Sequence, residues 1–457
     1  MIDASTYKAR RDRLRDKLQG GTALFLGHAL APRNYTDNVY PFRQNSHFLY
    51  LCGLLRPGLA LLVGPKEDIL FGRENDLDDV VWHGPRPRLL EEAAGAGLAN
   101  VQPAEALEGV VRSGDAAALH VLFPYQGDQQ IFGSRLLGIS IEAFAERSSS
   151  LLAEAMYELR ARKSPEEIAQ IEDALTVTAA MHAASFRHTR PGVLESAVAA
   201  ASERVALAMG RAQAYNPIVT VRGEVLHNHE HHHQLEDGHL LLNDSGAESP
   251  LFYASDITRT APVSGRFSTE QRKIYDIVLD AQLRSIGKVA PGVPNRDVHL
   301  EAALAIAEGL TELGLMRGKP QEAVDAGAHA LFFPHGIGHM LGLDVHDMED
   351  LGDVVGYGVG VKRSEQFGLN FLRLARPLEE GFVITIEPGI YFIDALIDRF
   401  EAAGTHSRFL NFDRIQQYRG FGGIRIEDDV LCTRTGRRVL GPPIPKSADE
   451  VEAAMRG

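Results

Sequence analysis

The stretch Leu240–Val263, LLLNDSGAESPLFYASDITRTAPV, constrains the fold most, because it embeds two acidic side chains in apolar runs. Asp244 and Asp256 each lie in a run typical of a β-strand, and Pro250 between them marks a turn. If the chain folds back near Pro250, Asp244 faces Asp256 directly and their carboxylates lie roughly 5 Å apart. Like charges that close require a proton or a cation between them. The stretch therefore predicts an antiparallel hairpin and indicates a metal site.

The overall composition limits the size and class of the protein. A chain of 457 residues is too long for one compact core, so we expect two domains. The formal net charge of −14 argues against nucleic acid or an anionic membrane as a partner. The two cysteines, Cys52 and Cys432, lack metal-ligand spacing and favour a reducing, cytoplasmic compartment. We expect neither a signal peptide nor a membrane span.

Short apolar runs broken by glycine and proline characterise the amino-terminal third. The runs TALFLG, FLYLCGL, LALLVGP and DILFG are typical of strands, and helical segments follow them. This alternation predicts an α/β domain over residues 1–158. Within it, the charge pattern of residues 7–18 predicts a solvent-facing helix. Residues 40–50 and 80–86, the latter with the only tryptophan, are interpreted as a packed aromatic strand and a turn.

Residues 159–457 are predicted to form a second, larger domain of α+β character. Ser164 and Pro165 precede two glutamates in the order of a helix start, and Ser268–Gln271 has the form of a capping box. Two helices, then strands, then two helices, then strands suggest a duplicated unit. Helices are expected at 165–188, 194–209, 269–289 and 297–313, and strands at 216–222, 239–247, 252–263, 381–392 and 423–433.

Further candidate ligands lie in three later segments. The segment FPHGIGHMLGLDVHD contributes three histidines: His335, His339 and His346. Glu387 ends an apolar strand directly before a proline. Strand alternation places Arg425 and Glu427 on one face of another strand. Each of the two strands thus carries a glutamate where its neighbours are expected to be buried.

Each of these residues has a structural alternative when it is taken alone. A histidine on an apolar strand is usually a hydrogen-bonded core residue, Glu427 and Arg425 could form a surface ion pair, and the aspartates could cap their own hairpin. Together these alternatives weaken, because burying an unpaired carboxylate is costly. Oxygen ligands with one imidazole suit Mn²⁺ or Co²⁺, and tolerate Zn²⁺ or Fe²⁺, better than copper. Four acids and one histidine suffice for two ions that share carboxylates.

The run His227–His233, HNHEHHH, has the composition of a metal-binding tract. It lies in a polar loop between predicted strands, so we interpret it as a solvated loop. His227 is the exception, because it follows Val225 and Leu226 and could project from the strand end into the site.

The motifs DSGAE…ASDITRT, HGIGHMLGLDVHD, TIEPG and GGIRIEDDV, in this order, resemble those of the pita-bread metallopeptidases. The resemblance is to the proline-specific branch that holds aminopeptidase P and prolidase. YPFRQNSHFLYLCGL and VVWHGPR resemble the amino-terminal domain of the same enzymes, so the resemblance covers almost the whole chain. It implies a pita-bread catalytic domain with a smaller α/β amino-terminal domain. It also implies a metal-dependent exopeptidase that acts on Xaa-Pro bonds.

The resemblance implies five ligands for two divalent ions, Mn²⁺ first and Co²⁺ or Zn²⁺ as alternatives: Asp244, Asp256, His339, Glu387 and Glu427. Asp256 and Glu427 would bridge the ions. Glu387 would also carry the proton of the attacking water to the leaving proline nitrogen.

Further residues are implied to contact the substrate: His227, His335, His346, Arg373 and Arg425. Either His335 or His346 would stabilise the oxyanion together with a metal ion. Arg425 matches an arginine beside the bridging glutamate. Arg373 matches the arginine with which prolidases bind the carboxylate of a dipeptide, and its alternative is a solvated loop arginine.

The long segment between His346 and Glu387, with Arg373 inside it, resembles prolidase, so the prediction is an Xaa-Pro dipeptidase. Aminopeptidase P, which acts on longer Xaa-Pro peptides, is the alternative. A metal-free hydrolase of the same fold and a catalytically silent binding module are disfavoured by the intact ligand set. The expected partners are proline-containing di- or oligopeptides and further copies of the chain, in a homodimer or homotetramer.

One departure from the family concerns the hairpin. The spacing from Asp244 to Asp256 is one residue longer than the family pattern, at Ser249-Pro250. We expect the extra residue to alter the hairpin tip and to leave the ligands in place.

Overall fold

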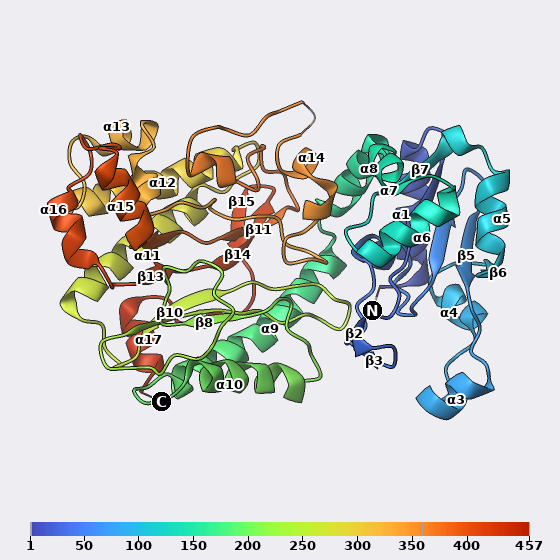
Figure 1. The fold of residues 1–457 in the computed structure, drawn as a ribbon, viewed down its shortest axis with the longest axis horizontal. Coiled ribbons are helices and arrows are strands. Elements are labelled where there is room, and N and C mark those ends of the chain that lie inside the picture. The colour runs from blue at the N-terminus through green and yellow to red at the C-terminus, as the bar shows by residue number, and fades with distance from the viewer. Residues whose placement is uncertain (1, 359, 457) are drawn as a thin grey trace. The chain divides into compact units, whose positions relative to one another are not determined.

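The computed structural model describes residues 2–358 and 360–456 and divides the chain into two compact units. The amino-terminal unit comprises Met1–Arg160 with Met348–Val355, and the carboxy-terminal unit comprises Ala161–Asp347 with Gly356–Gly457. Both units contain helices and strands (Figure 1), which confirms the mixed α and β fold. None of the described helices is long and apolar enough to cross a membrane.

The amino-terminal unit is built on a five-stranded sheet of order β6-β5-β4-β1-β7. Its centre is antiparallel, and the edge strands β6 and β7 run parallel to their neighbours. The strands are β1 (Thr22–Leu26), β4 (Ala60–Val63), β5 (Asp68–Gly72), β6 (Asn100–Pro103) and β7 (Leu119–Val121), with a separate hairpin of β2 (Pro32–Tyr35) and β3 (Asn38–Val39). The helices are α1 (Ala4–Lys17), α2 (Ser46–Cys52), α3 (Leu77–His83), α4 (Leu89–Gly95), α5 (Ala106–Ser113), α6 (Gly127–Leu137), α7 (Ile141–Glu146) and α8 (Ser150–Arg160).

The aromatic segment predicted as a strand is a helix, α2. The Asn45 side chain accepts the N–H of Phe48 at its start, and Gly53 ends it with a φ of 67°. All residues of α2 are buried, so the segment shows no one-sided apolar stripe to mark it as helical. The strand prediction for FLYLCGL, and with it the packed strand at 40–50, is wrong.

Two further predictions for this unit are corrected. The segment 80–86 begins inside α3, where Trp82 is 79% exposed and therefore not packed. The helix α1, predicted to face solvent, buries Arg11, whose guanidinium donates to Asp68 at 2.7 Å and to two backbone carbonyls. Charge spacing does not reveal such burial, because an arginine is tolerated inside when its N–H groups are paired.

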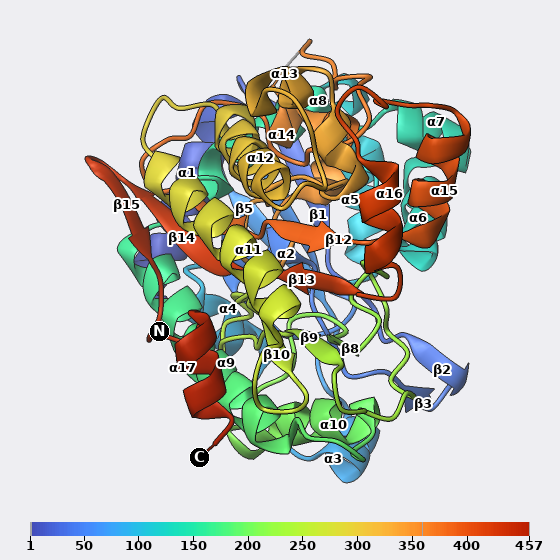
Figure 2. The ribbon, with the colours of Figure 1, turned by 90° about the vertical axis from the view of Figure 1, so that its left-hand side faces the viewer.

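The carboxy-terminal unit contains two helix pairs, each packed on strands. Helix α9 (Pro165–His188) packs on α10 (Glu195–Ala208), and α11 (Thr269–Lys288) packs on α12 (Asn295–Glu312). Helix α10 contacts β8, whereas α11 contacts β11, β12 and β13, as Figure 2 shows. The strands are β8 (Ile218–Thr220), β9 (Leu240–Asp244), β10 (Thr258–Pro262), β11 (Val383–Ile386), β12 (Gly389–Tyr391), β13 (Gly423–Arg425), β14 (Asp428–Thr433) and β15 (Gly436–Val439). Shorter helices of this unit are α13 (Pro320–Asp325), α15 (Asp394–Ala402), α16 (Phe412–Ile415) and α17 (Ala448–Ala454), whereas α14 (Asp353–Gly356) belongs mostly to the segment Met348–Val355 of the amino-terminal unit.

The order of two helices, strands, two helices and strands is confirmed. The strands form sheets of order β10-β9-β8 and β11-β14-β15 and the pair β12-β13. The predicted helix starts are also confirmed: the Ser164 side chain caps α9 and the Ser268 side chain caps α11, each within a capping box. These helices support the strands from which the candidate site is built.

Strands β9 and β10 form the predicted hairpin in a different register. Asp244 pairs with Thr258, and Asp256 lies just ahead of β10, so the predicted direct opposition of the two aspartates is wrong. At the tip, the Ser249 N–H donates to the Tyr253 carbonyl. The turn is therefore centred one residue beyond Pro250, which shifts the pairing by two residues. A shift of two keeps every side chain on its predicted face.

Candidate metal centre

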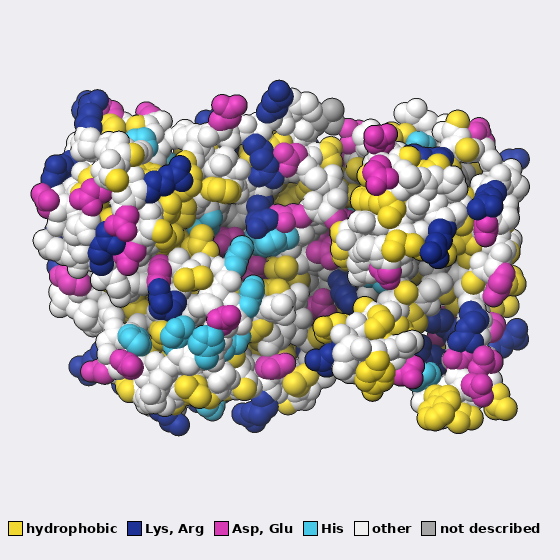
Figure 3. Space-filling view, viewed as in Figure 1, with side chains coloured by type: hydrophobic (Ala, Val, Ile, Leu, Met, Phe, Trp, Pro, Cys, Tyr) yellow, Lys and Arg dark blue, Asp and Glu magenta, His cyan; other side chains and the backbone are white. Residues whose placement is uncertain are grey.

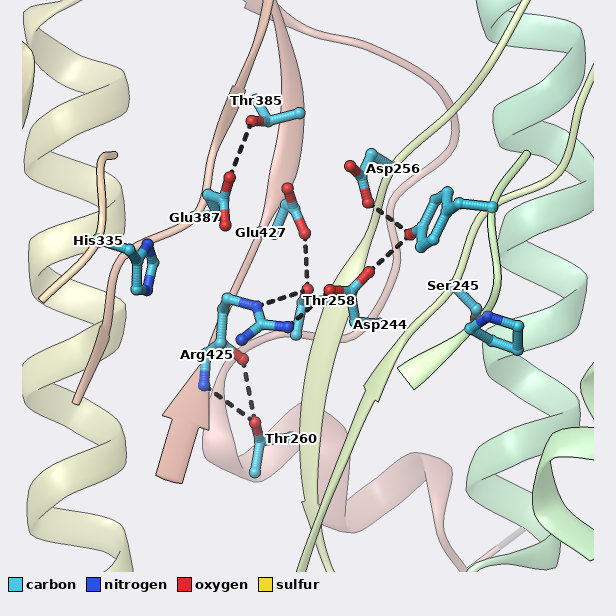
Figure 4. Close-up of polar contacts among 12 residues, drawn as sticks. Asp244, Ser245, Asp256, Thr258, Thr260, His335, Thr385, Glu387, Arg425 and Glu427 are labelled. Carbon is cyan, nitrogen blue, oxygen red and sulfur yellow. Dashed lines mark hydrogen bonds and ion pairs between the residues drawn. The ribbon is translucent and has the colours of Figure 1, made fainter. Parts of the chain in front are cut away.

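A cavity of about 630 Å³ lies within the carboxy-terminal unit. Every residue that the sequence singled out for the site lines it: His227, Asp244, Asp256, His335, His339, His346, Arg373, Glu387, Arg425 and Glu427. The acids come from the end of β9, from the segment ahead of β10, from the segment after β11 and from the turn between β13 and β14. Figure 4 shows Asp244, Asp256, Glu387 and Glu427 directed toward one another from these separate segments.

A tyrosine hydroxyl lies between the two aspartates. Tyr215 Oη is 2.7 Å from Asp244 Oδ1 and 2.5 Å from Asp256 Oδ1. A hydroxyl has one proton, so it donates to one carboxylate at a time. Asp244 Oδ2 also accepts a hydrogen bond of 2.6 Å from Arg425 Nη2 (Figure 4). Asp244 is therefore compensated by a cation, whereas Asp256 accepts no hydrogen bond from lysine or arginine within the described part of the chain.

His339 faces the remaining acids. Its Nε2 lies 3.4 Å from Asp256 Oδ2 and 3.7 Å from Glu387 Oε1. Its Nδ1 is 3.0 Å from the Met340 carbonyl oxygen, which places the proton on Nδ1 and the lone pair on Nε2. Ligand atoms of Asp256, His339 and Glu427 all lie within 4.8 Å of one another. This spacing leaves room for an ion between them.

The electrostatics of the cluster call for positive charge. Burial, with a contribution from neighbouring carboxylates, raises the pKa of Asp256 and of Glu427 well above the ordinary range. Burial likewise raises the pKa of Glu387 to about 7. At Asp244, burial opposes ionisation, but the Arg425 guanidinium and the Tyr215 hydroxyl lower the pKa overall. Of the four acids, Asp244 is the one that accepts a hydrogen bond from Arg425.

This donor set fits two divalent ions. Four carboxylates and one imidazole nitrogen match the oxygen-rich coordination of Mn²⁺, and also serve Co²⁺ or Zn²⁺. Hydroxyls hold one oxygen of each glutamate: Thr258 Oγ1 donates to Glu427 Oε2 at 2.6 Å, and Thr385 Oγ1 donates to Glu387 Oε1 at 3.4 Å (Figure 4). Such supporting contacts orient the carboxylates for an ion.

A chain of hydrogen bonds holds His335 at the cavity wall. Arg425 Nη1 donates to the Tyr391 hydroxyl at 3.1 Å, and that hydroxyl donates to His335 Nε2 at 2.8 Å. His335 Nδ1 in turn donates to the Gly336 carbonyl at 2.8 Å. Burial and the nearby Arg425 charge lower the pKa of His335 to about 3, so the ring is neutral.

The other predicted substrate residues also reach the cavity. The His346 ring lies with its centroid 4.2 Å from that of His339. Burial and the Arg425 charge lower the pKa of His227. Arg373 and Arg363 also line the cavity, so they bring positive charge to a cavity that holds four acids. Arg373 is half-buried, and its contact with a substrate carboxylate stays a prediction.

Four residues of the site escaped sequence analysis: Tyr215, Thr258, Thr385 and Tyr391. Tyr215 precedes β8 in AQAYNPIVT, a segment with no charged residue to draw attention. Thr258 and Thr385 read as ordinary strand residues. Strand alternation offered the only signal, because Thr385 shares a face with Glu387.

Comparison with known proteins defines the class of the enzyme. Residues 169–434 match the family Peptidase_M24, metallopeptidase family M24, and residues 7–118 match the aminopeptidase P amino-terminal domain. The chain belongs to metallopeptidase family M24. The predicted resemblance and the prediction of a metal-dependent peptidase are confirmed.

Individual relatives place the chain near enzymes of the proline-specific branch. The Xaa-Pro aminopeptidase of Escherichia coli (strain K12) is 33% identical, over 99% of this chain and 98% of its own length. The Xaa-Pro dipeptidase of Homo sapiens is 31% identical, over 100% of this chain and 94% of its own length. The structure of Pseudomonas aeruginosa aminopeptidase PepP matches with a TM-score of 0.82 at 30% identity, over 100% of this chain and 98% of that one.

Proposed function

We propose that the chain is an Xaa-Pro aminopeptidase that uses two divalent ions to hydrolyse the bond before a proline in the second position of a peptide. The observation that carries the proposal is the group Asp256, His339 and Glu427, whose ligand atoms lie within 4.8 Å of one another in the cavity. The 33% identity to the Escherichia coli Xaa-Pro aminopeptidase over 99% of this chain supports the substrate class.

Five side chains would hold the ions: Asp244, Asp256, His339, Glu387 and Glu427. Among the described residues neither Asp256 nor Glu427 accepts a hydrogen bond from lysine or arginine, so bound ions would supply the charge that compensates them. When bound, the ions supply a water nucleophile of lowered pKa and polarise the scissile carbonyl. We propose Mn²⁺ as the resident ion, with Co²⁺ or Zn²⁺ as alternatives.

Glu387 would hold and move the proton. Its side chain is 18% exposed, so it is more open to the cavity than Glu427, which is 1% exposed. Thr385 and His339 contact only its Oε1. A carboxylate in this position accepts a proton from water and returns it to the leaving proline nitrogen.

The hydrogen bonds of His335 indicate which of the two histidines, His335 or His346, contacts the oxyanion. His335 donates from Nδ1 to Gly336 and accepts at Nε2 from Tyr391, so neither ring nitrogen offers an N–H to the substrate. We therefore assign the contact with the oxyanion to His346 and a positioning role to His335. His227, on the same cavity, would line the peptide-binding surface.

Substrate length distinguishes the proposed activity from the predicted dipeptidase. The relatives favour the aminopeptidase, at 33% identity, only slightly over the dipeptidase, at 31%. The dipeptidase is kept as a second candidate because Arg373 lines the cavity, where a guanidinium would bind the carboxylate of a dipeptide. Arg363 lines the same cavity and serves as a matched control.

The test compares Ala-Pro with Ala-Pro-Ala on the Mn²⁺-loaded enzyme and on the variants R373A and R363A. The proposed aminopeptidase is expected to cleave the tripeptide with a kcat/KM at least equal to that of the dipeptide. R373A should then affect both peptides alike. A dipeptide preference of about tenfold or more that R373A removes and R363A keeps would establish the dipeptidase instead, since a charged hydrogen bond is worth roughly 1.5–3 kcal/mol.

A homodimer or homotetramer and a cytoplasmic location remain predictions. Both cysteines, Cys52 and Cys432, are buried and free, which supports a reducing compartment. Light scattering coupled to size-exclusion chromatography tests the oligomer directly, and a monomer at micromolar concentration would contradict it.

A further inference from the structure

Only part of the histidine-rich run His227–His233 lies at the proposed peptidase site. His227 and His229 line the cavity. Glu230, His232 and His233 follow at the surface, where their side chains are 75%, 65% and 38% exposed. Figure 3 shows histidine side chains gathered in a run on this face of the carboxy-terminal unit. The interpretation of the run as a solvated loop assigns no role to these exposed side chains.

The backbone of the run is anchored. The carbonyl of His231 accepts the N–H of Ser196 at 3.1 Å, and the carbonyl of His233 accepts the N–H of Glu195 at 3.0 Å. The Asn228 side chain accepts the N–H of Glu230 at 3.1 Å. The loop is thereby tied to the start of α10, and it presents its side chains from a fixed backbone.

A buried carboxylate orients the His233 ring. Glu195 Oε2 accepts from His233 Nδ1 at 3.1 Å and from the His233 backbone N–H at 2.9 Å. The Glu195 side chain is 0% exposed, and its other oxygen accepts from Val221 N and Thr220 Oγ1. The proton of the imidazole is therefore held on Nδ1 and the lone pair on Nε2. A carboxylate behind a histidine is the arrangement that orients histidine ligands in metal sites.

His232 and Glu230 bring two more donors to the same place. His232 Nε2 lies 3.3 Å from Glu230 Oε2. Neighbouring ligand atoms of a tetrahedral zinc site are separated by about the same distance, roughly 3.3 Å, given bonds of about 2.0–2.1 Å. The His232 ring is 5.1 Å from that of His233, with 30° between their planes. As placed, the ligand atoms of Glu230, His232 and His233 do not all lie within 4.8 Å of one another, so the largely exposed side chains of Glu230 and His232 would have to rotate toward His233 Nε2 to complete a site.

We propose that Glu230, His232 and His233 form a second metal site, on the surface, for a borderline divalent ion of the Zn²⁺ type. Two imidazoles and one carboxylate favour Zn²⁺ over Mn²⁺ or Mg²⁺, whereas the carboxylate-rich cavity serves harder ions. A fourth position remains for water. The two sites thus differ in the ion that they select, and the surface site does not depend on the peptidase proposal.

The test is equilibrium dialysis of the full chain, without an affinity tag, against Zn²⁺. The double variant H232A/H233A is expected to bind one equivalent of Zn²⁺ less than the native protein, and E230Q to bind that equivalent roughly tenfold more weakly. H239A is the control, because the His239 ring lies outside the run and accepts the N–H of Glu236.

Mn²⁺ binding and circular dichroism of each variant show that the cavity and the fold are intact. An unchanged Zn²⁺ count in H232A/H233A, or an equal loss in H239A, overturns the surface site. Peptidase activity does not enter either outcome, so failure here is distinct from failure of the proposed function. A co-bound Zn²⁺ in the cavity is present in all variants and cancels in the comparison.

Discussion

Glu427 and Asp428 are consecutive buried acids with opposite surroundings. Glu427 is 1% exposed, accepts from the Thr258 hydroxyl and, among the described residues, forms no ion pair with lysine or arginine. Asp428 is 4% exposed and accepts from Arg259 at 2.7 Å, from Lys446 at 2.7 Å and from Gln282 at 2.8 Å.

The pKa values of the two acids follow these surroundings. Burial and nearby carboxylates raise the pKa of Glu427, whereas at Asp428 the Arg259 and Lys446 charges outweigh burial and lower it. The comparison teaches that burial alone does not make an acid functional. Glu427, unlike Asp428, has no lysine or arginine partner among the described residues, so a metal ion is needed to compensate its charge.

The largest expected effect is that of Glu427→Gln. The change removes the charge of a proposed metal ligand, so we expect kcat to fall on the order of 1,000-fold and the number of bound Mn²⁺ ions to drop, because metal catalysis supplies several kcal/mol. Activity on Ala-Pro-Ala and metal analysis of the purified protein measure both.

Asp428→Asn, at the next residue, is the matched control. Breaking a buried ion pair is expected to lower the free energy of unfolding by about 3–5 kcal/mol while the Mn²⁺ count stays unchanged. Chemical unfolding of the metal-loaded protein measures this. Equal loss of Mn²⁺ in Glu427→Gln and Asp428→Asn would contradict the assignment of Glu427 as a metal ligand and of Asp428 as a structural ion-pair residue.

The pH dependence of the metal-free protein sharpens the comparison. The pKa of Glu387 is raised from 4.5 to about 7, so its contribution to stability is complete below about pH 4.5 and is lost as the pH rises through 7. The loss is on the order of 3 kcal/mol. Asp256 and Glu427 act in the same direction, whereas the stability that Asp428 contributes through its lowered pKa is present above about pH 4 and is lost as the pH falls further.

Unfolding of chelator-treated protein at pH 5 and pH 8 is the measurement, with Mn²⁺-loaded protein as reference. We expect the treated protein to lose stability at pH 8 and the loaded protein to keep it. The same pH dependence of stability with and without Mn²⁺ would show that the buried acids of the site do not cause the loss of stability at pH 8.

Tyr215→Phe should have the smallest effect. The variant removes the hydroxyl between Asp244 and Asp256 but keeps all charged ligands. Loss of a supporting hydrogen bond typically weakens metal binding by about 10–100-fold, so we expect a higher Mn²⁺ requirement with near-normal kcat at saturating metal. Mn²⁺ titration of activity tests it, and Tyr391→Phe, which removes a hydroxyl that contacts Arg425 and His335 but neither aspartate directly, is the comparison.

Much of the site was predictable because its residues stand out locally. The glutamate before Pro388, the histidines in a glycine-rich segment and the acids in apolar strands are visible one motif at a time. Helix starts at Ser164 and Ser268 were equally legible, since a cap uses only near neighbours. The helix α2 was missed, because complete burial removes the periodicity on which a helix prediction depends.

By itself, the sequence determined which side chains are available as donors and on which face of a strand each one lies. Strand alternation is a local property, so each side chain lies on its predicted face although the hairpin register is shifted by two residues. Only the tertiary structure decided which acids meet a cation. Arg259 and Lys446 reach Asp428 from distant parts of the chain and leave Glu427 to a metal, because ion pairing depends on distance in space and not on position in the chain.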